Sequence, residues 1–533
     1  MMSLLDRRPR LLLVLLCLLL WTPGFFTIPA EDRDESRFTQ ATKQMLETGD
    51  FVRIMNGAEA RNRKPIGIHW LQAPFVAAAH GLGLAQENPV WPYRIPSALG
   101  GLVAVLACFG IGERLIGRRA ALLGASMLAA SVLLVTEVHI AKTDAALLGA
   151  TTVAMAGLAR AYLGPGRLGW RAAAPFWLAI GVGVLLKGPI TPMVVGLTAG
   201  TLWLLDRRAG RAGFVGRLHA GWGVPLMLAV VLPWFVAIGV ATDGRFFSDA
   251  VGGDLGRKLT SGDDAHGGPP GLHLMLLPLL VFPGTAALPG GVAAAWRQRG
   301  TPAVRFLLAW IIPAWLVFEA APTKLPHYTL PMYPAVCLLL AWGLFEAWGC
   351  WRRLGAALAG LVTILLVSVC VAAPVFLGAS LWLGLPGALA AFVVGWFALR
   401  GVAVQAAARA VVLMPLLYGA VLEWEAPRLW PLWLTPRVLA AAPHSGWGRL
   451  ASVGYSEPSL MFLAGTGTRW LLAGEAATAL SDGVVDTLLV GDRDLGAVRA
   501  ALAARGLMPR VAAEVPGFNY SRGRKVVLTA LTR

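Results

Sequence analysis

The hydrophobic positions of this chain form long continuous runs and not the alternating pattern of half-buried strands. Each run is roughly 17–25 residues long, which is the length a helix needs to cross a lipid bilayer. The pattern therefore predicts a polytopic α-helical membrane protein. We expect thirteen membrane-spanning helices, at about residues 11–29, 97–114, 119–138, 144–163, 173–187, 189–205, 222–241, 271–290, 303–320, 328–348, 354–375, 379–399 and 404–424.

The C-terminal part of the chain has a different pattern. Residues 450–455, 484–490 and 525–531 are strand-like, and residues 495–505 have the spacing of an amphipathic helix. We therefore expect two domains, which are a transmembrane domain at residues 1–430 and a soluble α/β domain at residues 434–533. The second domain lacks a glycine-rich phosphate loop, so a structural or lid-like role is favoured over a nucleotide site.

The distribution of positive charge predicts the topology. Arginines concentrate in alternate short loops, as the positive-inside rule requires of cytoplasmic loops. With thirteen spans and a cytoplasmic N-terminus, the C-terminus lies outside the cytoplasm. The arginines are Arg114, Arg118, Arg119, Arg160, Arg167, Arg171, Arg207, Arg208, Arg211, Arg217, Arg297, Arg299, Arg305, Arg352, Arg353 and Arg400.

Composition agrees with a membrane protein and excludes a nucleic-acid binder. Of the 533 residues, 57% are hydrophobic and only 14% are charged, and the net charge is +17. The basic residues are scattered among short loops and form no continuous patch, so no nucleic-acid partner is expected.

The first loop outside the cytoplasm, within residues 30–95, is long and carries charges of both signs. Asp32 and Glu35 fit a capping box at the start of a helix that Gly49 ends. A basic cluster follows, and then an amphipathic stretch at residues 66–84. The cluster contains Arg61, Arg63 and Lys64. Acids, bases and a surface helix in this order indicate a site at the membrane face.

Ionisable residues also collect near the outer ends of later spans. Simple explanations exist for single residues: Lys187 and Lys324 can extend from span ends into water, Asp144 can cap a helix, and His266 can be solvated in its glycine-rich loop. Their concentration on one face favours function, because lysines opposite carboxylates suit a reaction on an anionic, lipid-linked group. The outer-face set is Asp34, Glu35, Lys64, His69, Glu137, His139, Lys142, Asp144, Lys187, Asp254, His266, Lys324, His327 and Tyr328.

Several short motifs, in order along the chain, resemble those of the GT-C membrane glycosyltransferases. The likeness is to the aminoarabinose-transferase-like (ArnT-like) branch, which is related to the protein O-mannosyltransferases. The motifs are Asp34-Glu35-Ser36-Arg37-Phe38, Met45-Leu46-Glu47-Thr48-Gly49-Asp50, Lys64-Pro65, Trp70-Leu71-Gln72, Lys142-Thr143-Asp144, Lys187-Gly188-Pro189, the stretch from His266 to Gly271, and the stretch from Lys324 to Pro331.

This resemblance implies a GT-C fold and a polyprenyl-phosphate-linked sugar as donor, cleaved at the periplasmic face of the inner membrane with inversion. It implies catalytic acids at Asp34, the adjacent Glu35, and Asp144. Donor phosphate contacts are implied at Lys64, Lys187, Lys324, Tyr328 and Arg63. The cofactor is left unknown. A divalent metal ion at His266 is the candidate, and Arg63 argues against it because some relatives place a glutamate there.

The acceptor and its chemistry stay open. A hydroxyl acceptor on lipid A, another glycan or a protein needs Asp34 as general base, whereas an anionic acceptor needs Asp34 only for orientation. Two other function classes compete with a hexosyl- or pentosyltransferase. A transporter or flippase of a lipid-linked sugar places its charges near the bilayer midplane, often in internal repeats. A structural envelope component has no need of the outer-face charges.

Overall fold

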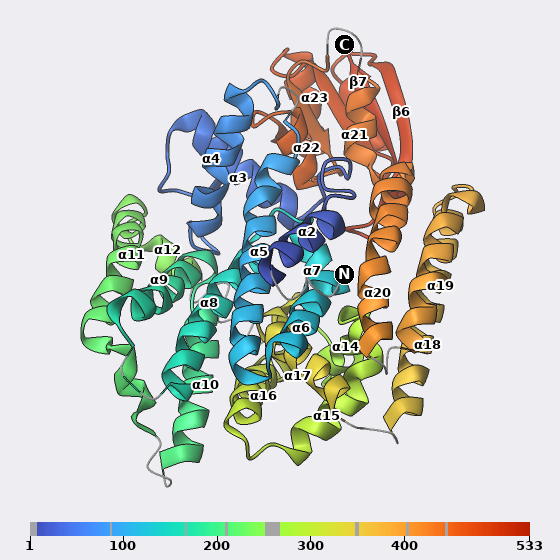
Figure 1. The fold of residues 1–533 in the computed structure, drawn as a ribbon. Coiled ribbons are helices and arrows are strands. Elements are labelled where there is room, and N and C mark those ends of the chain that lie inside the picture. Colours follow the sequence, from blue (N-terminus) through green and yellow to red (C-terminus); the bar gives the residue numbers. More distant parts are fainter. Residues whose placement is uncertain are drawn as a thin grey trace.

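The computed structural model describes residues 8–85, 88–164, 166, 168–207, 212–250, 267–346, 351–400, 404–442 and 446–533. Most of these residues form a bundle of helices, and the C-terminal sheet sits at one end of it (Figure 1). The bundle and its connections contain α2 (Pro9–Trp21), α3 (Asp34–Thr48), α4 (Gly67–Gly81), α5 (Trp91–Leu115), α6 (Arg118–Ala130), α7 (Val132–Val138), α8 (Thr143–Leu163), α9 (Trp170–Lys187), α10 (Ile190–Asp206), α11 (Ala220–Ala241), α12 (Arg245–Phe247), α14 (Leu272–Leu280), α15 (Leu288–Arg297), α16 (Pro302–Ala320), α17 (Tyr333–Phe345), α18 (Arg352–Phe376), α19 (Leu385–Leu399) and α20 (Val404–Tyr418).

Each predicted span contains an apolar helix. In the described part of the chain, eight helices are long and apolar enough to cross a membrane, and two further candidates are bent pairs. The pair α6 and α7 bends by 55°, and the turn from α14 into residues 284–297 bends by 119°. Three of the predicted spans correspond to shorter apolar helices, α2, α10 and α19. The protein is a multi-span membrane protein, and the number of thirteen crossings stays a prediction.

Small residues bring α5 and α8 into close contact. A Cβ atom on Gly100 of α5 would lie 2.4 Å from the Cα atom of Ala146 on α8. A Cβ atom on Gly149 would lie 2.6 Å from the carbonyl oxygen of Gly100. Glycine allows such backbone approach between helices in a membrane. This packing fixes the outer ends of both helices, which carry site residues.

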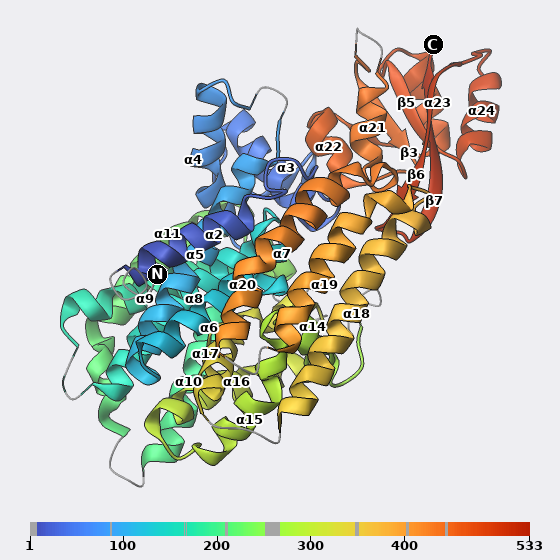
Figure 2. The same cartoon turned by 45° about the vertical axis from the view of Figure 1, so that its right-hand side comes forward.

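The first loop folds into two helices at the same end of the molecule as the C-terminal sheet (Figures 1 and 2). Helix α3 ends at Gly49, as predicted, in a left-handed conformation with φ of 73°. The predicted capping box is wrong, because the helix begins at Asp34 and its N-cap is Arg33, with no side-chain cap. Glu35 reaches instead to the backbone N–H of Glu31, at 2.8 Å. A short hairpin, β1 (Met55–Asn56) and β2 (Glu59–Ala60), leads to α4.

The C-terminal segment forms a five-stranded mixed sheet in the order β4-β3-β5-β7-β6. β3 pairs in parallel with β4 and β5, and β7 pairs antiparallel with β5 and β6. The predicted α/β character is thus confirmed, while the boundary at residue 434 stays a prediction. The elements are α21 (Leu434–Ala440), β3 (Leu450–Val453), α22 (Pro458–Ala464), β4 (Arg469–Trp470), α23 (Ala473–Ser481), β5 (Thr487–Gly491), α24 (Leu495–Ala503), β6 (Arg510–Asn519) and β7 (Arg524–Thr532).

The sheet domain rests on the first loop. On α3, the Lys43 ammonium donates to the carbonyl oxygen of Phe462 at 3.0 Å, and Gln40 donates to the Thr466 hydroxyl at 2.9 Å. Just before α3, the Ser459 N–H donates to a carboxylate oxygen of Asp32 at 3.3 Å. These contacts join residues that are more than 400 positions apart, so the C-terminal segment helps to hold α3 in place.

Candidate active site

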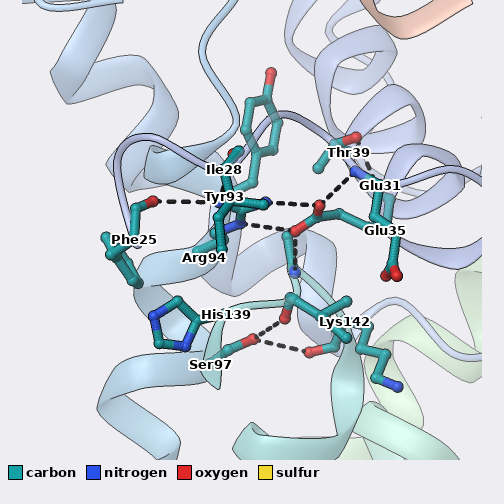
Figure 3. Close-up of polar contacts among 12 residues, drawn as sticks. Phe25, Ile28, Glu31, Glu35, Thr39, Tyr93, Arg94, Ser97, His139 and Lys142 are labelled. Atoms are coloured by element: carbon teal, nitrogen blue, oxygen red, sulfur yellow. Dashed lines mark hydrogen bonds and ion pairs between the residues drawn. The ribbon is translucent and has the colours of Figure 1, made fainter. Parts of the chain in front are cut away.

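A buried ion pair anchors the start of α3 to the bundle (Figure 3). Glu35 and Arg94 are both fully buried, and the carboxylate accepts from Arg94 Nε and Nη2 at 2.9 Å each. The same carboxylate also accepts from the N–H of Ala141 at 2.7 Å. A buried charge is stable only when it is paired and hydrogen-bonded in this way. Glu35 therefore ties α3, α5 and the segment before α8 to one point.

Arg94 extends this anchor to the end of the segment that follows α2. Its remaining donors bind the carbonyl oxygens of Phe25, Ile28 and Pro29 at 3.0–3.2 Å. Close to Arg94, the Ser97 hydroxyl donates to the carbonyl oxygen of Ile140 at 2.8 Å (Figure 3). The two segments that carry Asp34 and Asp144 are thereby locked to each other.

Asp34 lies next to Glu35 in sequence but is exposed to solvent. About 42% of its side chain is accessible, compared with 0% for Glu35. One carboxylate oxygen is 3.6 Å from Nη2 of Arg61. The ammonium of Lys64 is the main reason that the pKa of Asp34 lies well below its usual value, and Arg61 adds to the effect. Asp34 is therefore an ionised, accessible carboxylate beside two cations.

The cations of the basic cluster are arranged around one aromatic ring. The Lys64 ammonium lies 4.8 Å from the centre of the Phe38 ring, and the Arg61 guanidinium lies 4.5 Å from it. Burial lowers the pKa of Lys64 to about 8, with the charge of Asp34 opposing the effect. Arg63 is exposed. Sequence reasoning chose Lys64 and Arg63 from this cluster, whereas the structure places Arg61 and Lys64 beside Asp34.

A second charged cluster occupies the outer ends of α7, α8 and α9. Asp144 pairs with Lys187, lies 3.9 Å from Lys142, and lies 3.8 Å from Nε2 of His327. Glu137 lies 3.0 Å from the Lys142 ammonium and 3.6 Å from Nδ1 of His327. All five side chains are largely buried. Two carboxylates and two lysines thus face each other in a confined space.

The two clusters lie close enough for their charges to interact. The charges of Lys187 and Asp144 both act on the titration of Lys64, and the charge of Lys142 acts on Asp34. Tyr328, on the turn of 3₁₀ helix at Pro326–Met332, presents its ring 5.2 Å from the Lys187 ammonium. The predicted residues Asp34, Lys64, Asp144, Lys187 and Tyr328 are therefore gathered at one end of the bundle.

Other predicted residues bind backbone carbonyl oxygens or other side chains. The Lys324 ammonium donates to the carbonyl oxygens of Gly268 and Ala321 at 3.2 and 2.8 Å. His139 is buried between the carbonyl oxygens of Val135 and Pro23, at 2.7 and 2.8 Å. His69 is buried as well, with Nδ1 2.8 Å from the Thr42 hydroxyl, and burial lowers its pKa to about 3. The two histidines serve the packing of the first loop. Asp254 and His266 lie outside the described residues.

Sequence reasoning missed Arg94, and it named Arg61 in the basic cluster without giving it a role. Arg94 had a readable signal, since a single arginine at the outer end of a span runs against the positive-inside rule. Nothing in the sequence tells Arg61 from Arg63, because the hairpin geometry decides which one faces Asp34. Glu137 and His327 were included in the outer-face set but were given no role.

The described residues do not fit a resident divalent metal ion. Among them, no group of three or more His, Cys, Asp or Glu side chains is arranged to hold one. Asp34, the most accessible carboxylate of the site, already faces Arg61 and Lys64. Two adjacent cations disfavour a third positive charge at that position.

Comparison with known proteins shows which families and folds this chain is similar to. Residues 30–243 match the family described as dolichyl-phosphate-mannose-protein mannosyltransferase. The crystal structure of ArnT from Cupriavidus metallidurans bound to undecaprenyl phosphate superposes with a TM-score of 0.75 at 21% identity, covering 98% of this chain and 97% of that one. The chain therefore has the fold of ArnT, and its first part is similar to the mannosyltransferase family.

Two further relatives of this chain are curated enzymes named undecaprenyl phosphate-alpha-4-amino-4-deoxy-L-arabinose arabinosyl transferase. The protein of Pseudomonas paraeruginosa is 27% identical over 60% of this chain and 58% of its own length. That of Pseudomonas aeruginosa PAO1 is 27% identical over 66% of this chain and 63% of its own length. This chain thus spans roughly three fifths of the length of these relatives. An archaeal oligosaccharyltransferase from Archaeoglobus fulgidus shares the fold at a TM-score of 0.52 and 11% identity, over 93% of this chain and 70% of that one.

Proposed function

We propose that this protein is an inverting glycosyltransferase that uses a polyprenyl-phosphate-linked sugar as donor. The observation that carries the proposal is the ionised, accessible carboxylate of Asp34 beside Lys64, next to the buried cluster of Asp144 and Lys187. The lysines supply positive charge for a phosphate, and Asp34 supplies a base or an orienting acceptor. The lysines act on the leaving phosphate, and Asp34 acts on the acceptor that attacks the anomeric carbon.

The reaction breaks the bond between the anomeric carbon and the phosphate oxygen. Negative charge then develops on the leaving polyprenyl phosphate, and preorganised cations stabilise it in the transition state. Lys64 and Lys187 are placed for this task, since Lys64 lies beside Asp34 and Lys187 pairs with Asp144. The acceptor oxygen attacks from the opposite side of the sugar, which inverts the anomeric configuration.

Binding of the donor also prepares Asp34. In the free protein, the ammonium of Lys64 is the main cause of the low pKa of Asp34, and a carboxylate with a low pKa is a weak base. A phosphate that pairs with Lys64 neutralises this charge and raises the pKa of Asp34. Asp34 then accepts the proton of a hydroxyl acceptor on lipid A, another glycan or a protein. For an anionic acceptor it orients the attacking group.

Glu35 takes a positioning role in this mechanism and not the catalytic role expected from sequence. Its carboxylate is buried, and its oxygens are occupied by Arg94 and two backbone N–H groups. Lys324 and Arg63 stay candidate phosphate ligands. The names of the curated relatives favour a pentosyl donor, specifically an aminoarabinosyl donor, over a hexosyl one.

The arginine distribution supports a site at the periplasmic face of the inner membrane. A transporter or flippase is the competing class, and the two bent spans are a feature that transporters share. The charged groups of this protein lie at span ends beside an extramembrane loop, which favours transfer over transport.

Reconstituted protein with undecaprenyl-phosphate-linked 4-amino-4-deoxy-L-arabinose and lipid A tests the proposal. Transfer is expected to produce modified lipid A and free undecaprenyl phosphate in equal amounts, measured by mass spectrometry. Movement of the intact donor between leaflets without cleavage would support the flippase instead. If only a donor that carries another sugar is consumed, the protein is still a transferase and the pentosyl assignment is wrong.

A further inference from the structure

A cavity lies at the opposite ends of the helices that carry the active site. It holds about 300 Å³ and is lined by residues of α2, α5, α8 and α9. On α8, Arg160 of the cavity and Asp144 of the active site are 16 positions apart. At about 1.5 Å per residue this is about 24 Å, so the cavity faces the other side of the membrane.

Three arginines from three different helices line this cavity. They are Arg10 on α2, Arg114 at the end of α5 and Arg160 near the end of α8. The positive-inside rule explains why arginines occur at this face. It gives no reason for three of them, distant in sequence, to converge on one cavity.

The charge of these arginines is poorly compensated. Glu113 lies 3.8 Å from Nη2 of Arg10, but it also lies 3.9 Å from Nε of Arg118. Within the described part of the chain, no carboxylate lies within ion-pair distance of Arg114 or Arg160. The cavity therefore carries a net positive charge that suits an anion.

The remaining walls are apolar. Ile111, Val153, Pro175 and Phe176 line the cavity together with small residues. Gly110 borders the open space, because a Cβ atom built on it meets no atom within 4 Å. A soluble anion gains nothing from such walls, whereas an acyl chain does.

We propose that this cavity binds an anionic phospholipid of the cytoplasmic leaflet. The arginines hold the headgroup phosphate through charge-assisted hydrogen bonds, and the apolar walls of α5, α8 and α9 receive the upper part of an acyl chain. The bound lipid bridges α2, α5 and α8, the helices whose other ends fix the first loop and Asp144.

Two variants test the site by different means. Arg114→Gln combined with Arg160→Gln removes charge, while Gly110→Leu fills the cavity and keeps every charge. Arg299→Gln is the control, because Arg299 lies at the same face but stacks on Trp296, 4.4 Å from its ring centre, outside the cavity. The probes are dioleoyl phosphatidylglycerol, dioleoyl phosphatidylcholine and inorganic phosphate, each added to detergent-purified full-length protein.

Thermal unfolding and native mass spectrometry give the readout. The wild-type protein and Arg299→Gln are expected to retain one phosphatidylglycerol and to be stabilised by it, but not by phosphatidylcholine or phosphate. The double arginine variant should weaken phosphatidylglycerol binding about 25-fold, which is about fivefold for each arginine, and Gly110→Leu should weaken it at least about fivefold. Equal binding by Gly110→Leu and the wild type, or equal stabilisation by phosphate alone, would overturn the proposal.

Discussion

Neutralising Glu35 should lower the stability of the protein, although Glu35 is a positioning residue that is buried away from the substrate. Glu35→Gln keeps the size of the side chain and removes the charge that Arg94 faces at 2.9 Å through two nitrogen atoms. Arg94 is fully buried, so its charge would be left without a counter-charge. Breaking a buried pair by removing one partner typically costs about 3–5 kcal/mol. Three backbone carbonyl oxygens still accept from Arg94, so the lower end of this range is expected.

The measurement is thermal unfolding in detergent, followed by the fluorescence of the 21 tryptophans. Glu47→Gln is the matched control on the same helix, because Glu47 pairs with Lys43 at 3.8 Å and is 41% exposed. Only Glu47 of this pair is exposed, and Lys43 keeps its hydrogen bond to the carbonyl oxygen of Phe462, so the control should lose much less stability than Glu35→Gln. A Glu35→Gln protein as stable as Glu47→Gln would refute the anchoring role of the buried pair.

Three other outcomes are expected. Lys64→Ala should raise the donor KM with little loss of stability, by about 10- to 100-fold if it removes one charged contact to the phosphate; unchanged kinetics would exclude Lys64 from donor binding. A reporter active only outside the cytoplasm should work when fused after Arg533 and fail near Arg208, and the reverse would invert the topology. Burial raises the pKa of Asp32 to about 7, so the folded protein keeps a proton on Asp32 that the unfolded chain releases at lower pH, and stability is lost as pH rises through 7. Asp32→Asn should therefore raise the unfolding temperature more at pH 8 than at pH 5. An equal effect at both pH values would contradict this.

The sequence was sufficient where local patterns decide the structure. Long apolar runs located the helices, Gly49 ended α3, and Gly188, with φ of 62°, forms the tight turn between α9 and α10. In the C-terminal segment, the strands β3, β5 and β7 were found, because their buried residues form short apolar runs. β6 was missed, since it pairs along one side only and exposes half of its residues.

Contacts between residues that are far apart along the chain could not be predicted from the sequence. Asp34 and Glu35 are neighbours with the same chemistry, and both were predicted to be catalytic. Their difference arises because Arg94, 59 positions after Glu35, lies under one of them only. Lys64 and Asp144 were correctly placed on one face, but the convergence of Lys142, Lys187 and His327 on Asp144 depends on helix packing.

The transfer activity of Asp34→Asn tests the central claim most directly. Asparagine keeps the size and hydrogen-bonding capacity of the side chain, and 42% of the Asp34 side chain is accessible, so the variant should fold. Its unfolding temperature should fall somewhat, because Lys64 and Arg61 lose the negative charge that they face. With a hydroxyl acceptor, a general base contributes about 10²–10⁴ in rate. Single-turnover transfer from saturating undecaprenyl-phosphate-linked sugar, at a temperature where both proteins are folded, should therefore fall by at least about 100-fold. Turnover near that of the wild type would contradict the assignment of Asp34 as the catalytic carboxylate.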